Sequence, residues 1–544
     1  MTLHLDRTTS DPPLSATEIT VHGDTAAADV LGALLHQSGA TVTRFPDAAG
    51  EPAHVDAGAS LTVGWGTVPG VRDEASAQAV CGLMHVHGRS QGSPRGLGLD
   101  HCSTAAGVVG GTGLLAALFG GASSVTTSVA EAALLTVSQY LAAAGAPEAE
   151  ATALAPGGPP FLSADGVLFE IEALDPGVWQ AFWTGLGVPG KVIGAGWRPF
   201  QFRYPTATAP LPVELQEAVG ARPFGEVEAL AGATGTSICR LHEPGTTGGP
   251  LFELTTLDSA HVGAAVRRAA AGAEAGSLTT PLSGVVVLEA GRRVQAPLAA
   301  HLLHLLGATV IRVEPPGGDP LRGMPPMCGG TSARWLALNR GKSAVEIDIK
   351  DPADRDRLRD LVRTADVFLH NWAPGTAERL GLGAQDLAAV NPALVFVHTS
   401  GWANRLPDAP MGTDFMAQAR TGLGALLRPS DEPPAPSLMT LLDVLGGLLG
   451  AYTTVAALLQ RERTGRAIRA ESSLLAAAEL LQLNANGRPA PGFRRPLLGD
   501  GGWTHEGVPV TDDLASIPAD PRFAGVVGLD SDRCPEVLTP WRFR

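Results

Sequence analysis

Basic charge is scarce in this 544-residue sequence, which has only three lysines and no block of arginines. The lysines are Lys191, Lys342 and Lys350, and the formal net charge at pH 7 is −15. Sequence-independent binding to nucleic acids requires a basic surface, so this composition argues against a nucleic-acid-binding protein. Individual arginines and helix N-termini can still bind a small anionic molecule.

Cysteine is also rare, and no Cys-x-x-Cys pair occurs. The five cysteines are scattered along the chain: Cys81, Cys102, Cys239, Cys328 and Cys534. An odd, unpatterned set argues against a disulfide framework and a structural zinc site, and it fits a reducing compartment. The first residues, Met1 to Ser15, lack the apolar core of a signal peptide. We therefore expect a cytoplasmic protein.

The run Leu441 to Leu459 is apolar enough to raise the question of a membrane span. It contains Asp443 and three glycines, and a charge inside the bilayer costs several kcal/mol. We therefore expect a buried core helix and no membrane partner.

From residue 285 onward, short apolar runs alternate with helical patterns. The predicted strands are 285–288, 310–313, 344–349, 367–370 and 394–398. Repeated strand–helix–strand units predict an α/β fold with a Rossmann-like parallel sheet covered on both faces. Long helices are predicted for 439–460 and 472–483.

An internal repeat is visible in the first 150 residues. Residues 34–44 resemble residues 302–312, with Gly39 in the place of Gly307. Asp100 and Asp443 each precede a helix rich in Gly, Ala and Leu. The glycine-to-aspartate spacing is 61 residues in the first copy (100 − 39) and 136 in the second (443 − 307). We therefore predict a duplicated large domain, with Asp100 as the counterpart of Asp443; chance similarity of Ala-rich helices is the alternative.

A series of motifs in a fixed order runs through residues 281 to 490. They are Leu282 to Glu289, Val310 to Pro320, Asn339-Arg340-Gly341-Lys342, Asn371-Trp372-Ala373-Pro374-Gly375, Arg379-Leu380-Gly381 and Ser400-Gly401-Trp402. Together they resemble CoA-transferase family III, the group that includes formyl-CoA and carnitine-CoA transferases. Several motifs in order are a far stronger signal than any one of them.

The resemblance implies a catalytic aspartate. The family's nucleophile lies at the start of a helix that ends near a Thr-Gly-Arg-Gly segment. Asp443 and Thr464-Gly465-Arg466-Ala467 stand at these places, with Ala467 instead of the final glycine. Asp443 is thus expected to attack an acyl-CoA thioester and form an aspartyl anhydride and then an aspartyl-CoA. A plain helix cap is the alternative. Asp414 resembles the family's acidic residue before the nucleophile, and it either orients Asp443 or caps a helix.

The resemblance also implies residues that contact CoA: Gln295, Ala296, Lys342, Ile347, Asn371, Trp372 and Arg379. Lys342 and Arg379 can offer positive charge to phosphates, and Trp372 an aromatic face to adenine or pantetheine. Taken singly, each is equally well a surface charge or a core aromatic. The implied substrates are a CoA thioester and a carboxylic acid, with no permanently bound cofactor and no metal.

Four units are predicted along the chain. Residues 15–150 form a degenerate large-domain copy, 155–250 a small α/β domain, 281–490 the catalytic large domain, and 491–544 a closing segment. In the family, the small domain follows the large one and two chains interlock. Here the only small domain precedes the catalytic copy, so we predict that it completes the Asp443 site within one chain, as a pseudo-dimer. A homodimer is the alternative.

Two other functions stay open. The same fold also serves 2-methylacyl-CoA racemases, which use a His and an Asp to move an α-proton and carry a His-Asp pair at the position of the nucleophile. Here no His is adjacent to Asp443, and His398 is either a partner or, as its place in a predicted strand favours, a buried strand residue. A CoA-ester-binding protein without turnover is the second alternative. Asp100 is expected to be a relic or a structural cap.

Overall fold

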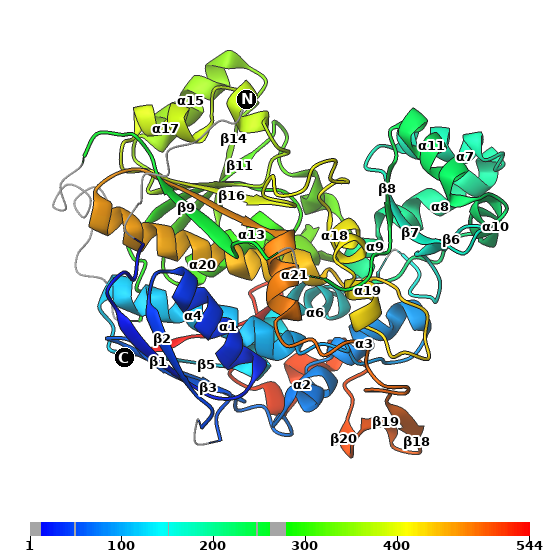
Figure 1. Ribbon diagram of the computed structural model, residues 1–544, viewed down its shortest axis with the longest axis horizontal. Helices are drawn as coiled ribbons and strands as arrows, with labels where there is room; N and C mark the ends of the chain where they lie inside the picture. Colours follow the sequence, from blue (N-terminus) through cyan, green and yellow to red (C-terminus); the bar gives the residue numbers. More distant parts are fainter. Residues whose placement is uncertain (1–11, 48–49, 151, 246–247, 262–278) are drawn as a thin grey trace.

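The computed structural model describes residues 12–47, 50–150, 152–245, 248–261 and 279–544. Figure 1 shows a body that contains two sheets and their helices, and a smaller unit built on β6 to β8 that projects from it. We call the body's two halves the N-terminal and C-terminal sheet units, and the projecting part the small unit.

The C-terminal sheet unit has seven strands in the order β14-β11-β10-β15-β16-β17-β9. Their bounds are β10 Val286–Ala290, β11 Thr309–Glu314, β14 Ser343–Glu346, β15 Val367–His370, β16 Val395–Ser400, β17 Ile468–Ser473 and β9 Phe252–Thr256. All neighbours are parallel except β9, which is antiparallel to β17. The predicted Rossmann-like parallel sheet is therefore confirmed.

Both faces of this sheet are covered, because alternate strand residues enter two separate cores. One core holds α13 (Gln295–Leu305), α20 (Leu441–Thr464) and α21 (Leu474–Gln482); the other holds α15 (Pro352–Val362), α16 (Thr376–Arg379) and α17 (Ala384–Val390). This is the arrangement expected of parallel strands made of continuous apolar runs.

The N-terminal sheet unit has the order β2-β1-β3-β4-β5-β23. Its elements are β1 Glu18–His22, α1 Ala26–Gln37, β2 Thr41–Phe45, β3 Ala53–Asp56, β4 Ser60–Gly64, α4 His101–Gly120, β5 Ser124–Ser128, α5 Val129–Thr136 and β23 Arg542–Phe543. Strand β3 lies between β1 and β4, as β15 lies between β10 and β16, but β3 is antiparallel to both neighbours. Residues 57–59 join β3 to β4, which is too short for the crossover that a parallel strand needs.

Each sheet ends with a strand from a distant part of the chain. Strand β9 follows the small unit in sequence and pairs with β17, whereas β23 lies at the end of the chain and pairs with β5. Both added strands run antiparallel to their neighbours. The two sheet units are therefore tied together by a reciprocal exchange of edge strands.

Helices α4 and α20 pack against each other between the sheets (Figure 1). A Cβ on Gly111 would lie 3.0 Å from the Tyr452 ring, so a glycine permits this contact. Among the described residues, these two helices are long and apolar enough to cross a membrane, but 89% and 94% of their apolar windows are buried inside the protein. Such burial is typical of core helices.

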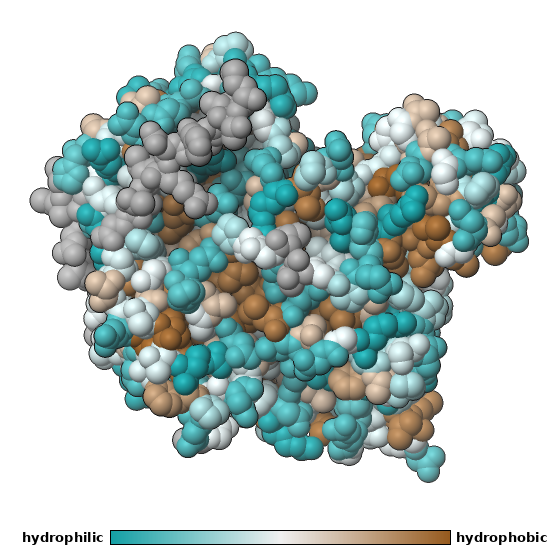
Figure 2. All heavy atoms as spheres, viewed as in Figure 1, coloured by the Kyte–Doolittle hydropathy of each residue, from teal (hydrophilic) through white to brown (hydrophobic). Residues whose placement is uncertain are grey.

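The small unit has an antiparallel sheet of β6 (Phe161–Leu162), β7 (Leu168–Glu172) and β8 (Ser237–Arg240). Its helices are α7 Pro176–Gly185, α8 Gly190–Gln201, α10 Val213–Gly220 and α11 Phe224–Thr234, and the short α9 (Arg203–Thr206) leads back to the body. Trp179, Phe182 and Trp183 fill its own core. Figure 2 shows the surface hollowed between this unit and the body.

The remaining elements connect these units. They are α2 Glu74–Val80, α3 Leu83–Gly88, α6 Ser138–Ala144, α14 Ala333–Asn339, α18 Asp414–Arg420, α19 Leu423–Leu426, β12 Met327–Cys328, β13 Thr331–Ser332, β18 Leu497–Gly499, β19 Gly502–His505, β20 Val508–Pro509, β21 Val527–Leu529 and β22 Pro535–Val537, with four short 3-10 turns.

Candidate active site

Asp443 lies half-buried in the first turn of α20. The backbone N–H groups of Leu442 and Asp443 both donate to Oδ2 of Asp414, at 2.7 Å each. Helix N–H groups in the first turn have no partner within the helix, and a carboxylate there offsets their partial positive charge. Asp414, on α18, therefore caps the helix that carries Asp443 and not its own helix.

Gln418 fixes this cap. Its side-chain amide donates to Oδ1 of Asp414 and to the carbonyl of Ser437, and its carbonyl oxygen accepts the N–H of Ser437 at 2.8 Å. Ser437 lies just before α20, so the amide ties the loop that leads into α20 to the residue that caps it. The Gln418 side chain is fully buried, and both its amide nitrogen and its carbonyl oxygen form hydrogen bonds.

Burial alters the acidity of both carboxyl groups. It raises the pKa of Asp443 to about 6, while the charge of Arg293 opposes this rise. Burial, and then the neighbouring Asp443, also raise the pKa of Asp414, against the effect of the three N–H donors. A carboxyl group in a cavity, with a pKa close to neutral pH, is a candidate for a catalytic role.

A cavity of about 20 Å³ lies beside Asp443. Its walls come from two units of the same chain: Glu172, Ala173, Leu174, Gln201, Arg203 and Tyr204 precede β10, and Arg293, Thr413, Asp414 and Phe415 belong to the C-terminal sheet unit. Glu172 pairs with Arg203 at 3.0 Å and accepts the Thr413 hydroxyl at 3.0 Å. The small unit and the segment after it thus close the space around Asp443.

A larger cavity of about 500 Å³ lies at the carboxyl ends of β10, β11, β14 and β15. This is where ligands of parallel sheets usually bind, and the volume suits a small-molecule site. Ile347 and Trp372, both predicted to contact CoA, line it. Arg292, Arg293 and Lys350 line it too, and sequence reasoning missed them, although each follows the end of a strand. Arg293 belongs to the walls of both cavities.

Lys342 does not contribute to this cavity, so the prediction that it meets phosphates is wrong. Its side chain is fully buried and donates to Glu289 at 2.9 Å, to Asn339 at 2.9 Å and to the carbonyl of Pro297 at 2.7 Å. Burial lowers its pKa to about 8, with Glu289 opposing the change. Glu289 and Asn339 also bind the buried Arg312. Asn339 and Lys342 therefore belong to a buried network of hydrogen bonds and ion pairs with Glu289 and Arg312.

Four other predicted residues line neither cavity. Gln295 and Ala296 are buried in the first turn of α13, where Gln295 donates to the carbonyl of Ser400 at 3.3 Å. The Asn371 amide accepts the N–H and donates to the carbonyl of Arg292, both at 2.9 Å. Arg379 is exposed and donates to Thr376 within α16. Asn371 thus acts on the cavity wall through Arg292.

We call the acid and the glutamine that bind a helix start, such as Asp414 and Gln418 at α20, a bracket. The N-terminal sheet unit has a second bracket, at the start of α4. Glu74 accepts the N–H groups of Cys102 and Ser103 at 2.9 and 2.8 Å, and the Gln78 amide binds Glu74 and the backbone of residues 97 and 99. The offset is constant, since 414 − 74, 418 − 78 and 437 − 97 all equal 340. The contact pattern of the cap therefore occurs twice in the chain.

This register corrects the predicted counterpart of Asp443. The residue at the same offset is Ser103 (443 − 340), whose buried hydroxyl donates to Glu74 at 2.7 Å. Asp100 instead matches Thr440: both precede their helix by one residue, with φ −83° and ψ 64° against φ −70° and ψ 69°. Asp100 pairs with Arg494 at 2.9 Å. The sequence comparison matched the two aspartates by chemistry, whereas the hydrogen bonds show a three-residue shift.

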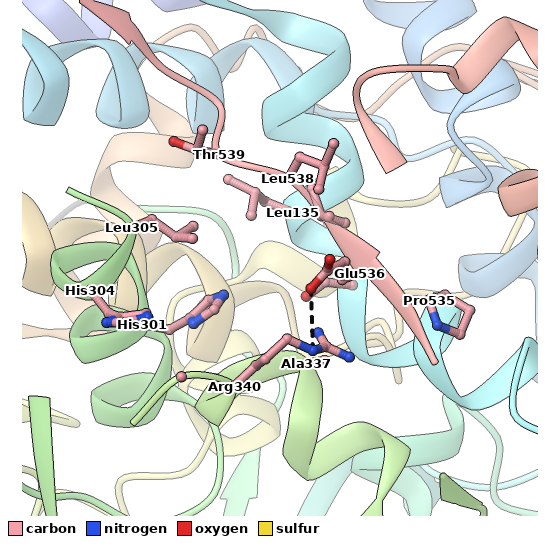
Figure 3. Close-up of a pocket in the computed structure, with 13 residues that line it drawn as sticks. Leu135, His301, His304, Leu305, Ala337, Arg340, Pro535, Glu536, Leu538 and Thr539 are labelled. Atoms are coloured by element: carbon pink, nitrogen blue, oxygen red, sulfur yellow. Dashed lines mark ion pairs between the residues drawn. The ribbon is translucent and has the colours of Figure 1, made fainter. Parts of the chain in front are cut away.

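Another cavity, of about 400 Å³, lies where α13 and α14 meet the end of the chain (Figure 3). Figure 3 shows His301 and Leu305 on one side of it and Glu536, paired with Arg340 at 3.3 Å, on the other. None of the predicted site residues lines it. Within the described part of the chain, no group of three or more His, Cys, Asp or Glu side chains could hold a metal ion.

Comparison with known proteins gives one family. The model of CoA-transferase family III matches residues 67–247 and 282–493. Succinyl-CoA:glutarate CoA-transferase of Mus musculus is 35% identical over 211 residues, which are 38% of this chain and 48% of the relative. The succinyl-CoA–L-malate CoA-transferase beta subunit of Chloroflexus aurantiacus is 36% identical over 35% of this chain and 47% of its own. The chain spans about half the length of the curated relatives it matches.

Among solved structures, a CAIB/BAIF family protein from Brucella suis is similar. The match has 24% sequence identity and a TM-score of 0.43, and it covers 49% of this chain and 93% of the other.

Proposed function

The chain belongs to CoA-transferase family III, and on that premise we propose that it transfers CoA from an acyl-CoA thioester to a free carboxylic acid, with Asp443 as the acyl carrier. The observation that carries the proposal is a half-buried carboxyl group at a helix start, beside a small cavity that shares Arg293 with a larger cavity whose wall holds further basic residues. The similar proteins are named as CoA-transferases of succinyl-CoA with glutarate and L-malate, which supports a carboxylic acid as acceptor here.

The proposed reaction has two pairs of steps. A carboxylate oxygen of Asp443 attacks the thioester carbonyl, the C–S bond breaks, and an acyl–aspartyl anhydride and the CoA thiolate form. The thiolate attacks the aspartyl carbonyl, which releases the donor acid as its carboxylate and leaves an aspartyl-CoA thioester. The acceptor carboxylate then repeats both steps in reverse, so that the new acyl-CoA leaves and the Asp443 carboxylate is restored. No net proton is gained or lost.

The pKa of Asp443 suits this role. At about 6 it leaves the group mainly ionised at neutral pH, yet its oxygens are more basic than those of an ordinary aspartate with a pKa near 3.8. The narrow cavity beside Asp443 also limits access of water, which would hydrolyse an anhydride. The larger cavity would hold the CoA moiety, with Trp372, Arg292 and Lys350 in its wall.

The racemase alternative has less support. Moving an α-proton needs a second acid or base, and no histidine lines the cavity beside Asp443. His398 instead lies 3.5 Å from Glu471 and stacks on His370. The inactive CoA-ester-binding alternative has no specific observation in its favour.

We also propose that one chain works alone, as a pseudo-dimer. The exchange of β9 and β23 and the small unit's side chains beside Asp443 support this arrangement. Light scattering after size exclusion should give the mass of one chain; a stable mass of two chains would contradict the proposal.

Trapping with hydroxylamine tests the function. Incubation with an acyl-CoA and hydroxylamine should convert Asp443 to a hydroxamate, which mass mapping of peptides detects, and Asp443→Asn should show no such product. If no acyl-CoA leaves a modified Asp443, while the α-hydrogen of a 2-methylacyl-CoA exchanges in deuterated water, the transferase proposal is wrong and the racemase is favoured.

A further inference from the structure

We propose that Arg293 binds the carboxylate of the acceptor acid beside Asp443, and that this acid is short, of about one or two carbons. The inference rests on the proposed CoA transfer and names its substrate class. Three observations support the proposal: the charge of Arg293, its backbone conformation and the volume of the cavity beside Asp443.

Arg293 is the cation in the cavity wall that is not committed to another side chain. The wall holds the carboxyl groups of Glu172, Asp414 and Asp443 and the guanidinium groups of Arg203 and Arg293. Arg203 pairs with Glu172 at 3.0 Å, and its guanidinium also lies over two phenylalanine rings. Within the described part of the chain, Arg293 makes no ion pair or hydrogen bond; it lies 5.3 Å from the centre of the Tyr204 ring.

An incoming carboxylate needs such a cation. When the acceptor acid enters, Asp443 carries CoA and is uncharged, but moving a carboxylate from water into the cavity costs free energy unless a positive charge lies near it. Arg293 already acts on Asp443, because its charge opposes the rise in the pKa of that group. A guanidinium can bind a carboxylate through two parallel N–H bonds, which would also orient the acid toward the aspartyl carbonyl.

The backbone holds Arg293 in an uncommon conformation. Its φ of +62° is in the left-handed region, which non-glycine residues seldom adopt. Such conformations persist where surrounding contacts enforce them, and they gather at functional sites. Here Asn371 grips the N–H and the carbonyl of the preceding Arg292. Asn371 is thus a positioning residue for the turn that brings Arg293 to the cavity.

The size of the cavity limits the acid. One water molecule needs about 10–15 Å³ measured in this way, so the 20 Å³ beside Asp443 admit one or two groups of that size. The large side chains in the wall are Tyr204 and Phe415. Tyr204 makes few polar contacts, since its hydroxyl lies 4.0 Å from the sulfur of Met324. Its ring is therefore the wall that a substitution can remove with least damage to the fold.

The first experiment separates the two half-reactions. Arg293→Gln should raise the KM for the acceptor acid about tenfold or more, the loss expected for a charge-assisted hydrogen bond, and Arg293→Lys should recover part of it. Hydroxamate formation at Asp443 from acyl-CoA should continue in both variants. The control is Arg222→Gln, which removes a surface arginine paired with Glu226. An acceptor KM unchanged in Arg293→Gln overturns the role of Arg293.

The second experiment measures chain length. The wild type should use acetate well and hexanoate poorly, and Tyr204→Ala should raise kcat/KM for hexanoate about tenfold relative to acetate. Phe202→Ala, an aromatic of the same segment outside the cavity wall, is the control, and thermal melting checks the fold of each variant. Equal kcat/KM values for acetate and hexanoate in the wild type would refute the proposal that the acceptor acid is short. That result leaves the proposed function intact as long as Asp443 is trapped, whereas absence of any trapped Asp443 refutes the function itself.

Discussion

Asp443 and Asp414 share one helix start but use their oxygens differently. Asp414 accepts three N–H groups, which occupy most of the acceptor positions of its carboxyl group. Asp443 lines the cavity, where the charge of Arg293 opposes the rise in its pKa. Two acids with separate surroundings can take separate roles. We assign positioning to Asp414 and nucleophilic attack to Asp443.

The pH dependence of acylation follows from this assignment. Because only the carboxylate attacks, the single-turnover rate of Asp443 acylation should rise with pH through about 6 and level off above it. Arg293→Gln should move the inflection to higher pH, since Arg293 lowers the pKa of Asp443. A wild-type rate that is constant through this pH range would contradict the pKa shift.

Lys342 offers a second test at the scale of the residue. Lys342→Ala should lower the free energy of unfolding by about 3 kcal/mol, because a buried carboxylate loses one of its partners, while the KM for acyl-CoA stays within about twofold. Lys350 is exposed in the wall of the larger cavity. Lys350→Ala should therefore leave the free energy of unfolding unchanged and raise the KM for acyl-CoA. Chemical denaturation and steady-state kinetics distinguish the two. A KM effect confined to Lys342→Ala would restore it as a phosphate contact.

Helices α4 and α20 begin in the same way, although only one of them carries an aspartate in its first turn. Each start is bracketed by an acid and a glutamine from another helix, and each glutamine binds the loop that precedes the long helix. Propensity alone would let these first turns fray. The bracket makes the start of α20 a rigid mount for Asp443.

The two brackets provide matched variants. Gln418→Leu and Gln78→Leu should each destabilise the protein by about 1–3 kcal/mol, because each leaves buried backbone groups without a partner. Only Gln418→Leu should also slow Asp443 acylation, because only its bracket holds the nucleophile. Thermal melts and single-turnover rates measure the two effects. Equal slowing by both variants would mean that the loss reflects general destabilisation.

At the scale of the whole molecule, two sheet units that share the same cap contacts accompany one small unit. The C-terminal unit keeps parallel strands whose carboxyl ends form the larger cavity. In the N-terminal unit, the antiparallel β3 turns its carboxyl end to the other edge, so that the corresponding cavity wall is absent from the fold as described. Because Ser103 stands in the place of Asp443, we propose that this unit serves as a scaffold.

The number of reactive sites should therefore be one per chain. Exhaustive trapping with acyl-CoA and hydroxylamine should add a single hydroxamate to each chain, as intact-mass measurement would show. Asp100→Asn should leave that number unchanged, because Asp100 binds Arg494 and has the place of a helix cap. A second modification at Asp100 or Ser103 would show that both units are active.

Local sequence alone determined the strands, the helices and the candidate nucleophile. Short apolar runs such as 367–370 are strands because they must be buried on both sides. Asp443 is the candidate nucleophile because the ordered motifs of residues 281–490 resemble CoA-transferase family III, which implies an aspartate at the start of this helix.

Tertiary structure decided what each charged side chain does. Lys342 can be buried because Glu289, 53 residues away in the sequence, pairs with it. Ser103 takes the place of Asp443 because Glu74 caps its helix. Arg293 reaches the cavity because Asn371 binds the backbone of the residue before it. A charge is read from the sequence, but its burial and partner depend on which distant segments pack together. That packing is what separates a phosphate contact from a structural ion pair.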